Sequence, residues 1–133
     1  MTGSAIYADS SSLVKLIIEE DESEALRRAI EEAGVGLLTS QIAEIEVARA
    51  VKIANPDQMG ECERLLASCT RVRVSESIIR RATALSSAQL RTLDAIHLAT
   101  ALRADVATML VYDERLGTAA GAAGLTVLRP GLP

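Results

Sequence analysis

Three aspartates of this chain stand where a helix is predicted to begin. Asp9 ends the apolar run 4–8, and Asp113 ends the apolar run 107–112. Asp94 lies in the first turn of another predicted helix. In an open parallel sheet, ligands bind beyond the carboxyl ends of the strands. We therefore expect Asp9 and Asp113 to face one rim, with Asp94 joining them if its helix begins at that rim.

Helix capping is the alternative role for each of these aspartates. Asp is a favoured residue at the N-cap and in the first turn of a helix, where it satisfies free backbone N–H groups. Taken singly, each aspartate is more commonly a cap than a ligand. Their combination adds only modest weight to a ligand site, because caps belong in the loops between strands and helices.

Glu46 lies on a helix face that also carries apolar residues. On the predicted helix 41–53 it falls between Ile42 and Ala50. An acid on this face approaches the core or a cleft, and a buried carboxylate is costly unless it is paired or binds a cation. An ion pair with Arg49, three residues further on, is the alternative. The sequence leaves both open.

Four carboxylates in one pocket would repel one another and raise their own pKa values. A divalent cation removes that conflict, and oxygen ligands favour Mg²⁺ or Mn²⁺ over zinc. Such a site suits phosphodiester cleavage, because the metal generates hydroxide from bound water and stabilises charge on phosphoryl oxygens. His97, the only histidine, follows Asp94 by one turn. It could approach substrate, but we interpret it as a helix-packing residue, because one histidine without a placed partner says little and no nucleophilic triad is evident. No glycine-rich phosphate loop is found.

Strands and helices alternate along the chain, which indicates a mostly parallel sheet with helices on both faces. The predicted strands are 4–8, 35–39, 70–74, 107–112 and 125–128. The predicted helices follow Asp9, cover 22–33, 41–53, 57–69 and about 76–87, run from a cap at Thr92 to Arg103, and extend from Asp113 toward Gly124. Residues 129–133 are expected to form a loose tail.

Composition limits the class of protein. A length of 133 residues fits one domain over 1–133, and an apolar content of 49% argues against disorder. Cys62 and Cys69 are expected to be reduced thiols on one helix, as in a cytoplasmic protein. No signal peptide or membrane span is evident. A net charge of −4 argues mildly against a nucleic-acid binder but suits metal cations or a basic partner protein.

The order of these acids resembles that of PIN-domain ribonucleases, most closely the VapC-type toxins of toxin–antitoxin pairs. Each motif alone is weakly specific, but all four occur in the family's order and span nearly the whole chain. They are residues 6–14 (Ile-Tyr-Ala-Asp-Ser-Ser-Ser-Leu-Val), 40–51 (Ser-Gln-Ile-Ala-Glu-Ile-Glu-Val-Ala-Arg-Ala-Val), 93–101 (Leu-Asp-Ala-Ile-His-Leu-Ala-Thr-Ala) and 110–116 (Leu-Val-Tyr-Asp-Glu-Arg-Leu).

The resemblance implies a fold and a reaction. The fold is a three-layer α/β/α sandwich, and the reaction is endoribonuclease cleavage by a metal-activated water. Mg²⁺ or Mn²⁺ is implied to bind chiefly through Asp9 and Asp94, with Glu46 and Asp113 completing the pocket directly or through waters. Ser11 matches a hydroxyl position that supports the first acid. The family also implies a homodimer and a VapB-type antitoxin that blocks the pocket, often with a basic side chain.

The chain departs from the family in its fourth motif and in its aromatic content. Val-Tyr precedes Asp113, where many relatives carry a hydroxyl residue earlier in the motif. Only Tyr7 and Tyr112 could stack on single-stranded bases, so RNA recognition is expected to rely on the backbone and on shape. Three arginines are candidate phosphate contacts, although each is equally suited to a solvated surface: Arg49, Arg91 and Arg115.

Two other functions place acids at the edge of a parallel sheet. A non-enzymatic receiver-like signalling module resembles this arrangement, but such modules carry an adjacent acidic pair and a late lysine. Here Ser10 follows Asp9, and no lysine occurs after Lys52. A DNA flap nuclease or exonuclease relative would use the same metal chemistry. Those enzymes carry extra elements that hold DNA, for which this chain is short.

Overall fold

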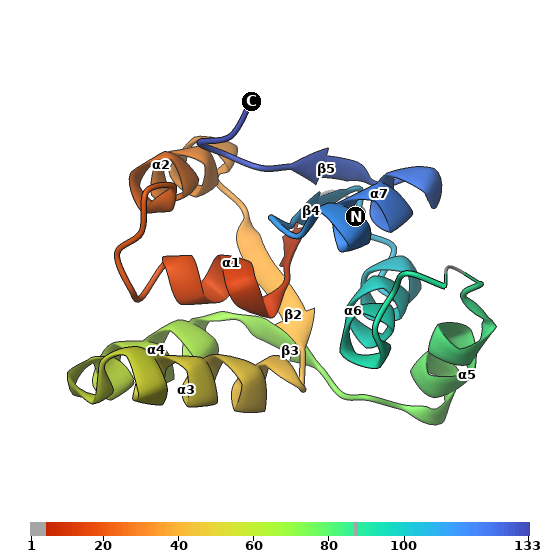
Figure 1. Cartoon of the computed structure of the whole chain (residues 1–133), viewed down its shortest axis with the longest axis horizontal. Coiled ribbons are helices and arrows are strands. Elements are labelled where there is room, and N and C mark those ends of the chain that lie inside the picture. Colours follow the sequence, from red (N-terminus) through yellow and green to blue (C-terminus); the bar gives the residue numbers. More distant parts are fainter. Residues whose placement is uncertain (1–4, 87) are drawn as a thin grey trace.

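The structure, a computed structural model, describes residues 5–86 and 88–133. At its centre is a five-stranded sheet with the order β3-β2-β1-β4-β5, in which every neighbouring pair of strands is parallel (Figure 1). The strands are β1 (Ala5–Ala8), β2 (Gly36–Ser40), β3 (Thr70–Val72), β4 (Thr108–Leu110) and β5 (Thr126–Leu128). The predicted parallel α/β sheet is confirmed.

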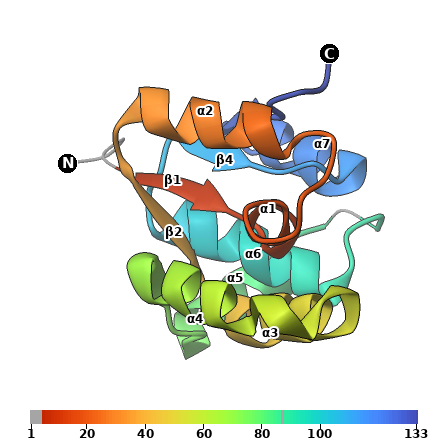
Figure 2. The same ribbon diagram turned by 90° about the vertical axis from the view of Figure 1, so that its left-hand side faces the viewer.

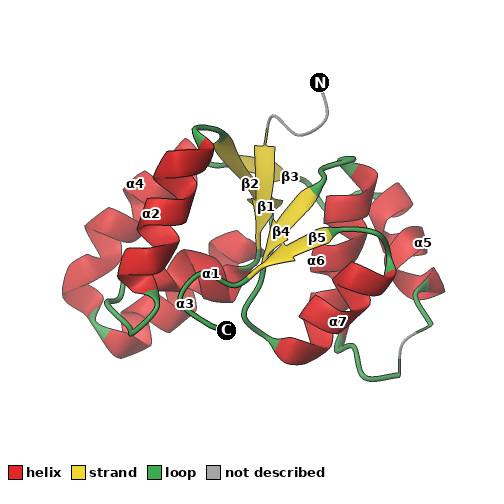
Figure 3. Ribbon diagram, turned by 90° about the horizontal axis from the view of Figure 1, so that it is seen from above, coloured by secondary structure: helices red, strands yellow, loops and turns green. Residues whose placement is uncertain are grey.

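Helices cover both faces of the sheet and complete the three layers (Figure 3). One face carries α1 (Ser10–Lys15), α2 (Ser23–Ala33), α3 (Ala43–Ala54) and α4 (Met59–Ser68), with the short 3-10 helix η1 (Pro56–Gln58) between the last two. The other face carries α5 (Glu76–Ala84), α6 (Thr92–Arg103) and α7 (Glu114–Ala122). Figure 2 shows α2 above strands β1 and β4, with α3 and α4 below them. No helix within the described ranges is long and apolar enough to cross a membrane.

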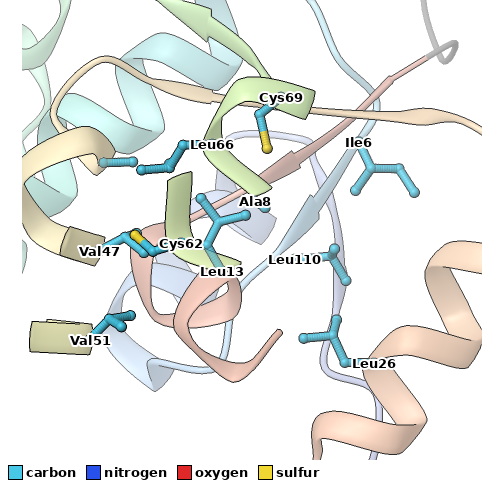
Figure 4. Packing of buried hydrophobic residues seen from close by; sticks show 11 residues of the cluster. Ile6, Ala8, Leu13, Leu26, Val47, Val51, Cys62, Leu66, Cys69 and Leu110 are labelled. Carbon is cyan, nitrogen blue, oxygen red and sulfur yellow. The ribbon is translucent and has the colours of Figure 1, made fainter. Parts of the chain in front are cut away.

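The central strand β1 is buried on both faces. Its alternating side chains enter two apolar cores, as period-two geometry requires. Ile6 and Ala8 pack with Leu13 and the other residues of the core beneath α1–α4 (Figure 4). Tyr7 points the other way and packs with Leu98 beneath α6 and α7. Two packed faces fix the end of β1, and therefore the residue that follows it.

The side of β1 on which new strands are added changes between β3 and β4. From β1 the chain builds β2 and β3 on one side, and then returns to place β4 and β5 on the other. The Asp9 backbone N–H donates to the Leu110 carbonyl at 3.3 Å, so the two strand ends lie side by side. Such a switch point is where parallel sheets bind their ligands.

Several predicted helix ends were wrong. Thr92 is the first residue of α6 rather than its cap, and Arg91 takes the N-cap position without a side-chain bond. The predicted helix 57–69 is divided into η1 and α4, because Pro56 starts a separate 3-10 turn. Helix α4 ends at Ser68, so Cys69 lies just beyond it and the two cysteines do not share one helix as predicted. Both cysteines are buried and free. Helix α5 ends at Ala84, and Ser87, its predicted limit, lies outside the described residues.

The segment after β5 is packed, at least as far as Gly131, so the prediction of a loose tail was wrong there. The Tyr112 hydroxyl donates to the Pro130 carbonyl at 2.8 Å. A Cβ on Gly131 would lie 3.2 Å from the Cα of Glu22 in the loop before α2, and its φ of 91° is one that glycine adopts without strain. This contact ties the end of the chain to α2.

Candidate active site

A pocket of about 320 Å³ opens beyond the carboxyl ends of β1 and β4. It brings together the four acids singled out from the sequence, although they come from four separate segments. Arg91 joins them, whereas Arg49 and Arg115 are not among the lining residues. The lining consists of Asp9, Ser11, Glu46, Arg91, Thr92, Leu93, Asp94 and Asp113.

Asp9 is the most enclosed acid of the pocket, with 4% of its surface exposed. Its Oδ1 accepts from the backbone N–H of Ser12 at 2.9 Å and from the Ser12 hydroxyl at 2.7 Å. The Ser11 hydroxyl lies 3.1 Å from each carboxylate oxygen. Burial raises the pKa of Asp9, and the hydrogen bonds from Ser12 and Ser11 only partly oppose this. The charge on Asp9 is therefore costly until a cation compensates it.

Asp9 is also the N-cap of α1, so its capping role and its place in the pocket are both real. The three serines that follow supply hydroxyls to two of the acids. Ser11 and Ser12 donate to Asp9, and Ser10 donates to Glu46 at 2.5 Å. A run of small hydroxyl residues in the first turn thus orients two acids at once.

His97, which belongs to α6 on the other face of the sheet, holds Glu46 in place. The Nε2 of His97 lies 2.8 Å from the Oε1 of Glu46, which is the same oxygen that Ser10 contacts. Burial raises the pKa of Glu46, but the hydrogen bonds from His97 and Ser10 outweigh it and leave the pKa below its ordinary value. Among the described residues, the ion pairs include none between Glu46 and Arg49, so that alternative was wrong.

Asp94 and Asp113 form the more open side of the pocket. Burial raises the pKa of Asp94, and the negative charges of Asp113 and Asp9 raise it further. Asp113 is exposed and caps α7, with its Oδ1 accepting from the Leu116 N–H at 2.9 Å. The capping alternative therefore holds for Asp113 as well. A cation in this pocket would offset both the burial and the like charge that raise the pKa of Asp94.

A hard divalent cation fits this set of donors. Within residues 5–86 and 88–133, no three acidic, histidine or cysteine side chains stand close enough to hold one ion together. Mg²⁺ commonly binds one or two carboxylates and keeps several waters, so a site of this kind needs no tighter cage. All the carboxylates offer oxygen, and no cysteine sulfur lines the pocket, which suits Mg²⁺ or Mn²⁺ rather than zinc.

The sequence did not reveal the residues behind Glu46. His97 is 2% exposed, and its interpretation as a helix-packing residue alone was wrong, because it contacts Tyr7, Ser10 and Glu46. Two signals were available. Ser10 directly follows the first acid, and His97 lies one turn after Asp94 on the same helix. Neither signal indicated that Glu46 would meet both.

Comparison with known proteins places these features in a family. The model of the PIN domain matches residues 6–122. The ribonuclease VapC46 of Mycobacterium tuberculosis is 40% identical over 128 residues, which cover 95% of this chain and 98% of the relative. A solved structure of VapC20 from the same species, a toxin that cleaves the sarcin–ricin loop, has a TM-score of 0.75 at 15% identity, covering 94% of this chain and 99% of that one. A toxin–antitoxin complex from Klebsiella pneumoniae has a TM-score of 0.72 at 24% identity, covering 95% and 97%. These two structures share the fold.

Proposed function

This chain belongs to the PIN-domain family, and from that premise we propose that it is the ribonuclease toxin of a toxin–antitoxin pair. Its 40% identity to a ribonuclease over nearly the whole of both chains supports RNA as the substrate, rather than DNA or a phosphodonor. The observation that carries the chemistry is the pocket that gathers Asp9, Glu46, Asp94 and Asp113. An RNA substrate also favours a cytoplasmic site of action.

The four acids have different parts in this proposal. Asp9 and Asp94 are the metal ligands in this proposal, because both line the pocket and a cation there would offset the burial and like charge that raise their pKa values. When bound, Mg²⁺ or Mn²⁺ supplies a hydroxide nucleophile and neutralises charge on the scissile phosphate. Glu46 and Asp113 complete the acidic lining of the pocket and would orient the attacking water. Ser11 holds the carboxylate of Asp9 in place.

The direct test is cleavage of a mixed RNA pool by the purified protein. We expect cleavage with Mg²⁺ and with Mn²⁺, and none with a chelator. Re-addition of the metal should restore cleavage, which separates loss of the cation from irreversible unfolding. Cleavage that continues unchanged in the chelator would refute a metal-dependent mechanism.

Arg91 is the arginine best placed to contact the RNA backbone. It lines the pocket, whereas Arg49 and Arg115 lie outside the lining and contribute at most to a wider basic surface. We expect Arg91→Gln to raise the KM for RNA several-fold with a smaller change in kcat, because a phosphate contact mainly adds binding. The dependence of binding on salt should weaken by about one phosphate contact.

Arg28 provides the matched control for this prediction. It is exposed on α2 and pairs with Glu24 at 3.4 Å, away from the pocket. Arg28→Gln should leave KM and the salt dependence at the wild-type values. Equal effects of the two substitutions would show that total charge, and not the position of Arg91, determines RNA binding.

A basic antitoxin is the second partner in this proposal. One of the solved structures that share this fold is a toxin–antitoxin complex. The net charge of −4 and the acidic pocket complement a partner that inserts a basic side chain among the carboxylates. Such an antitoxin should abolish RNA cleavage when it binds. It should also compete with Mn²⁺ for the pocket.

A homodimer is expected to use the exposed face of α3. Ile45 and Ile53 on this helix are 64% and 80% exposed, which is unusual for large apolar side chains. In contrast, the apolar residues among 13–18, in α1 and the turn that follows it, are buried or half-buried. We expect the double variant Ile45→Glu, Ile53→Glu to change a dimer into a monomer of 14.1 kDa by light scattering. A wild-type protein that is already monomeric at high concentration would contradict this.

A further inference from the structure

A continuous set of hydrogen bonds runs from the core beneath α6 and α7 to the pocket. The Tyr7 hydroxyl lies 2.6 Å from Nδ1 of His97, and Nε2 of the same ring lies 2.8 Å from Oε1 of Glu46. The two rings meet edge-on, with 5.7 Å between their centroids. Tyr7 and His97 are 90 residues apart in the chain and are 0% and 2% exposed. This arrangement is rigid because strand β1 and helix α6 are both packed in the core.

The chemistry of the three groups selects one tautomer of His97. An ionised carboxylate only accepts hydrogen bonds, so the contact with Glu46 requires a proton on Nε2. In a neutral imidazole, Nδ1 is then an acceptor. The Tyr7 hydroxyl lies 2.6 Å away and is placed to donate to it. The opposite tautomer would leave Nε2 and Glu46 as two acceptors facing each other.

Both donors to Glu46 engage the same oxygen. Ser10 and His97 contact Oε1, and Glu46 lines the pocket, so Oε2 is the oxygen that remains for solvent or substrate. Ser10 belongs to α1 and His97 to α6, which lie on opposite faces of the sheet. Glu46 is therefore fixed from two sides, although 27% of its side-chain surface stays exposed.

We propose that Tyr7 and His97 are positioning residues. Tyr7 holds His97 in the Nε2–H tautomer, and His97 in turn holds Glu46 so that its Oε2 faces the pocket. The inference deepens the proposed function and rests on it, because the position of Glu46 matters for a reaction in this pocket. Neither residue touches the substrate. Loss of a supporting hydrogen bond behind a site of this kind typically costs about 10–100-fold in activity.

Nitrogen NMR of the metal-free protein tests the tautomer directly. His97 is the only histidine, so ¹⁵N-histidine labelling of protein without a histidine tag gives one pair of ring signals. At neutral pH we expect one protonated nitrogen, Nε2, and one unprotonated nitrogen, Nδ1. In Tyr7→Phe the Nδ1 signal should shift, because its donor is gone. A doubly protonated ring, or a proton on Nδ1 alone, would overturn the proposal.

Kinetics then test whether the tautomer matters. Tyr7→Phe should lower kcat about tenfold with little change in KM. His97→Gln, which keeps a donor for Glu46, should retain more kcat than His97→Leu, which has none. The matched control is Tyr112→Phe, since that hydroxyl donates to the Pro130 carbonyl instead. Equal kcat values for Tyr7→Phe and the wild type would overturn the proposal.

The NMR and kinetic experiments distinguish failure of this inference from failure of the function on which it rests. Circular dichroism and thermal unfolding establish that each variant is folded before its kcat is compared. A wild-type protein that cleaves no RNA under any metal condition would refute the proposed function and the catalytic consequence of the tautomer. The NMR spectrum would still decide which ring nitrogen carries the proton.

Discussion

Asp9→Asn is expected to lower RNA cleavage about a thousandfold or more, because it removes the central ligand of a metal that supplies several kcal/mol of transition-state stabilisation. Asn keeps the size of the side chain and one carbonyl oxygen, so it can still accept the hydrogen bonds that Ser12 donates to Oδ1. The loss should therefore appear in kcat while the fold is kept. Single-turnover cleavage of the same RNA pool measures it.

The same substitution should not weaken the metal-free protein. The pKa of Asp9 is raised in the folded state, so the folded chain binds this proton more tightly than the unfolded chain does. Its stability contribution is present at low pH and is lost as the pH rises from the ordinary value through the raised value. Asn carries no charge at any pH. We therefore expect Asp9→Asn to be at least as stable as the wild type at neutral pH in chelator, with the difference shrinking in acid.

Asp21→Asn is the matched control, because Asp21 is an exposed aspartate in the loop before α2 and lies outside the pocket. It should retain full cleavage and the wild-type unfolding curve. Urea unfolding at two pH values checks the stability of all three proteins. An Asp9→Asn protein that is unfolded, or that cuts RNA at the wild-type rate, would contradict the assigned role.

Topology explains why much of the pocket could be predicted from the sequence. Asp9 and Asp113 follow parallel strands, and strands of one direction end at one edge of the sheet. Glu46 stood out because a carboxylate on an apolar helix face needs a partner. These inferences need only local pattern and the general geometry of parallel sheets.

The rest of the site depends on contacts that no local pattern contains. Tyr7 was recognisable as a core residue of β1, but its hydroxyl meets a ring 90 residues away, because α6 packs across the strand there. The sequence offered only Arg49, one turn along the same helix, as an ion-pair partner for Glu46, because nothing in the local pattern connects Glu46 with His97 on another helix. Tertiary packing places His97 against Glu46, and Ser10, the first of three consecutive serines, is the second donor.

Metal binding should reverse the stability order of the wild type and Asp94→Asn. Without metal, burial raises the pKa of Asp94, and repulsion from Asp113 and Asp9 raises it further. Asp94→Asn removes that repulsion, so in chelator the variant should have the higher Tm. A cation that binds only the folded wild type stabilises it by about 2.7 kcal/mol at 100 times its Kd. For a chain of this size that corresponds to roughly 10 °C in Tm.

Thermal unfolding in chelator and in rising Mn²⁺ measures both halves of this prediction. The wild-type Tm should climb with the metal and overtake that of Asp94→Asn, which should stay nearly level. The climb should shrink as the pH falls, because protons compete for carboxylates whose pKa values are raised. Asp105→Asn, outside the pocket, should follow the wild type. If Mn²⁺ raised the Tm of Asp94→Asn as far as that of the wild type, the cation would bind elsewhere, and Asp94 would serve the RNA rather than the metal.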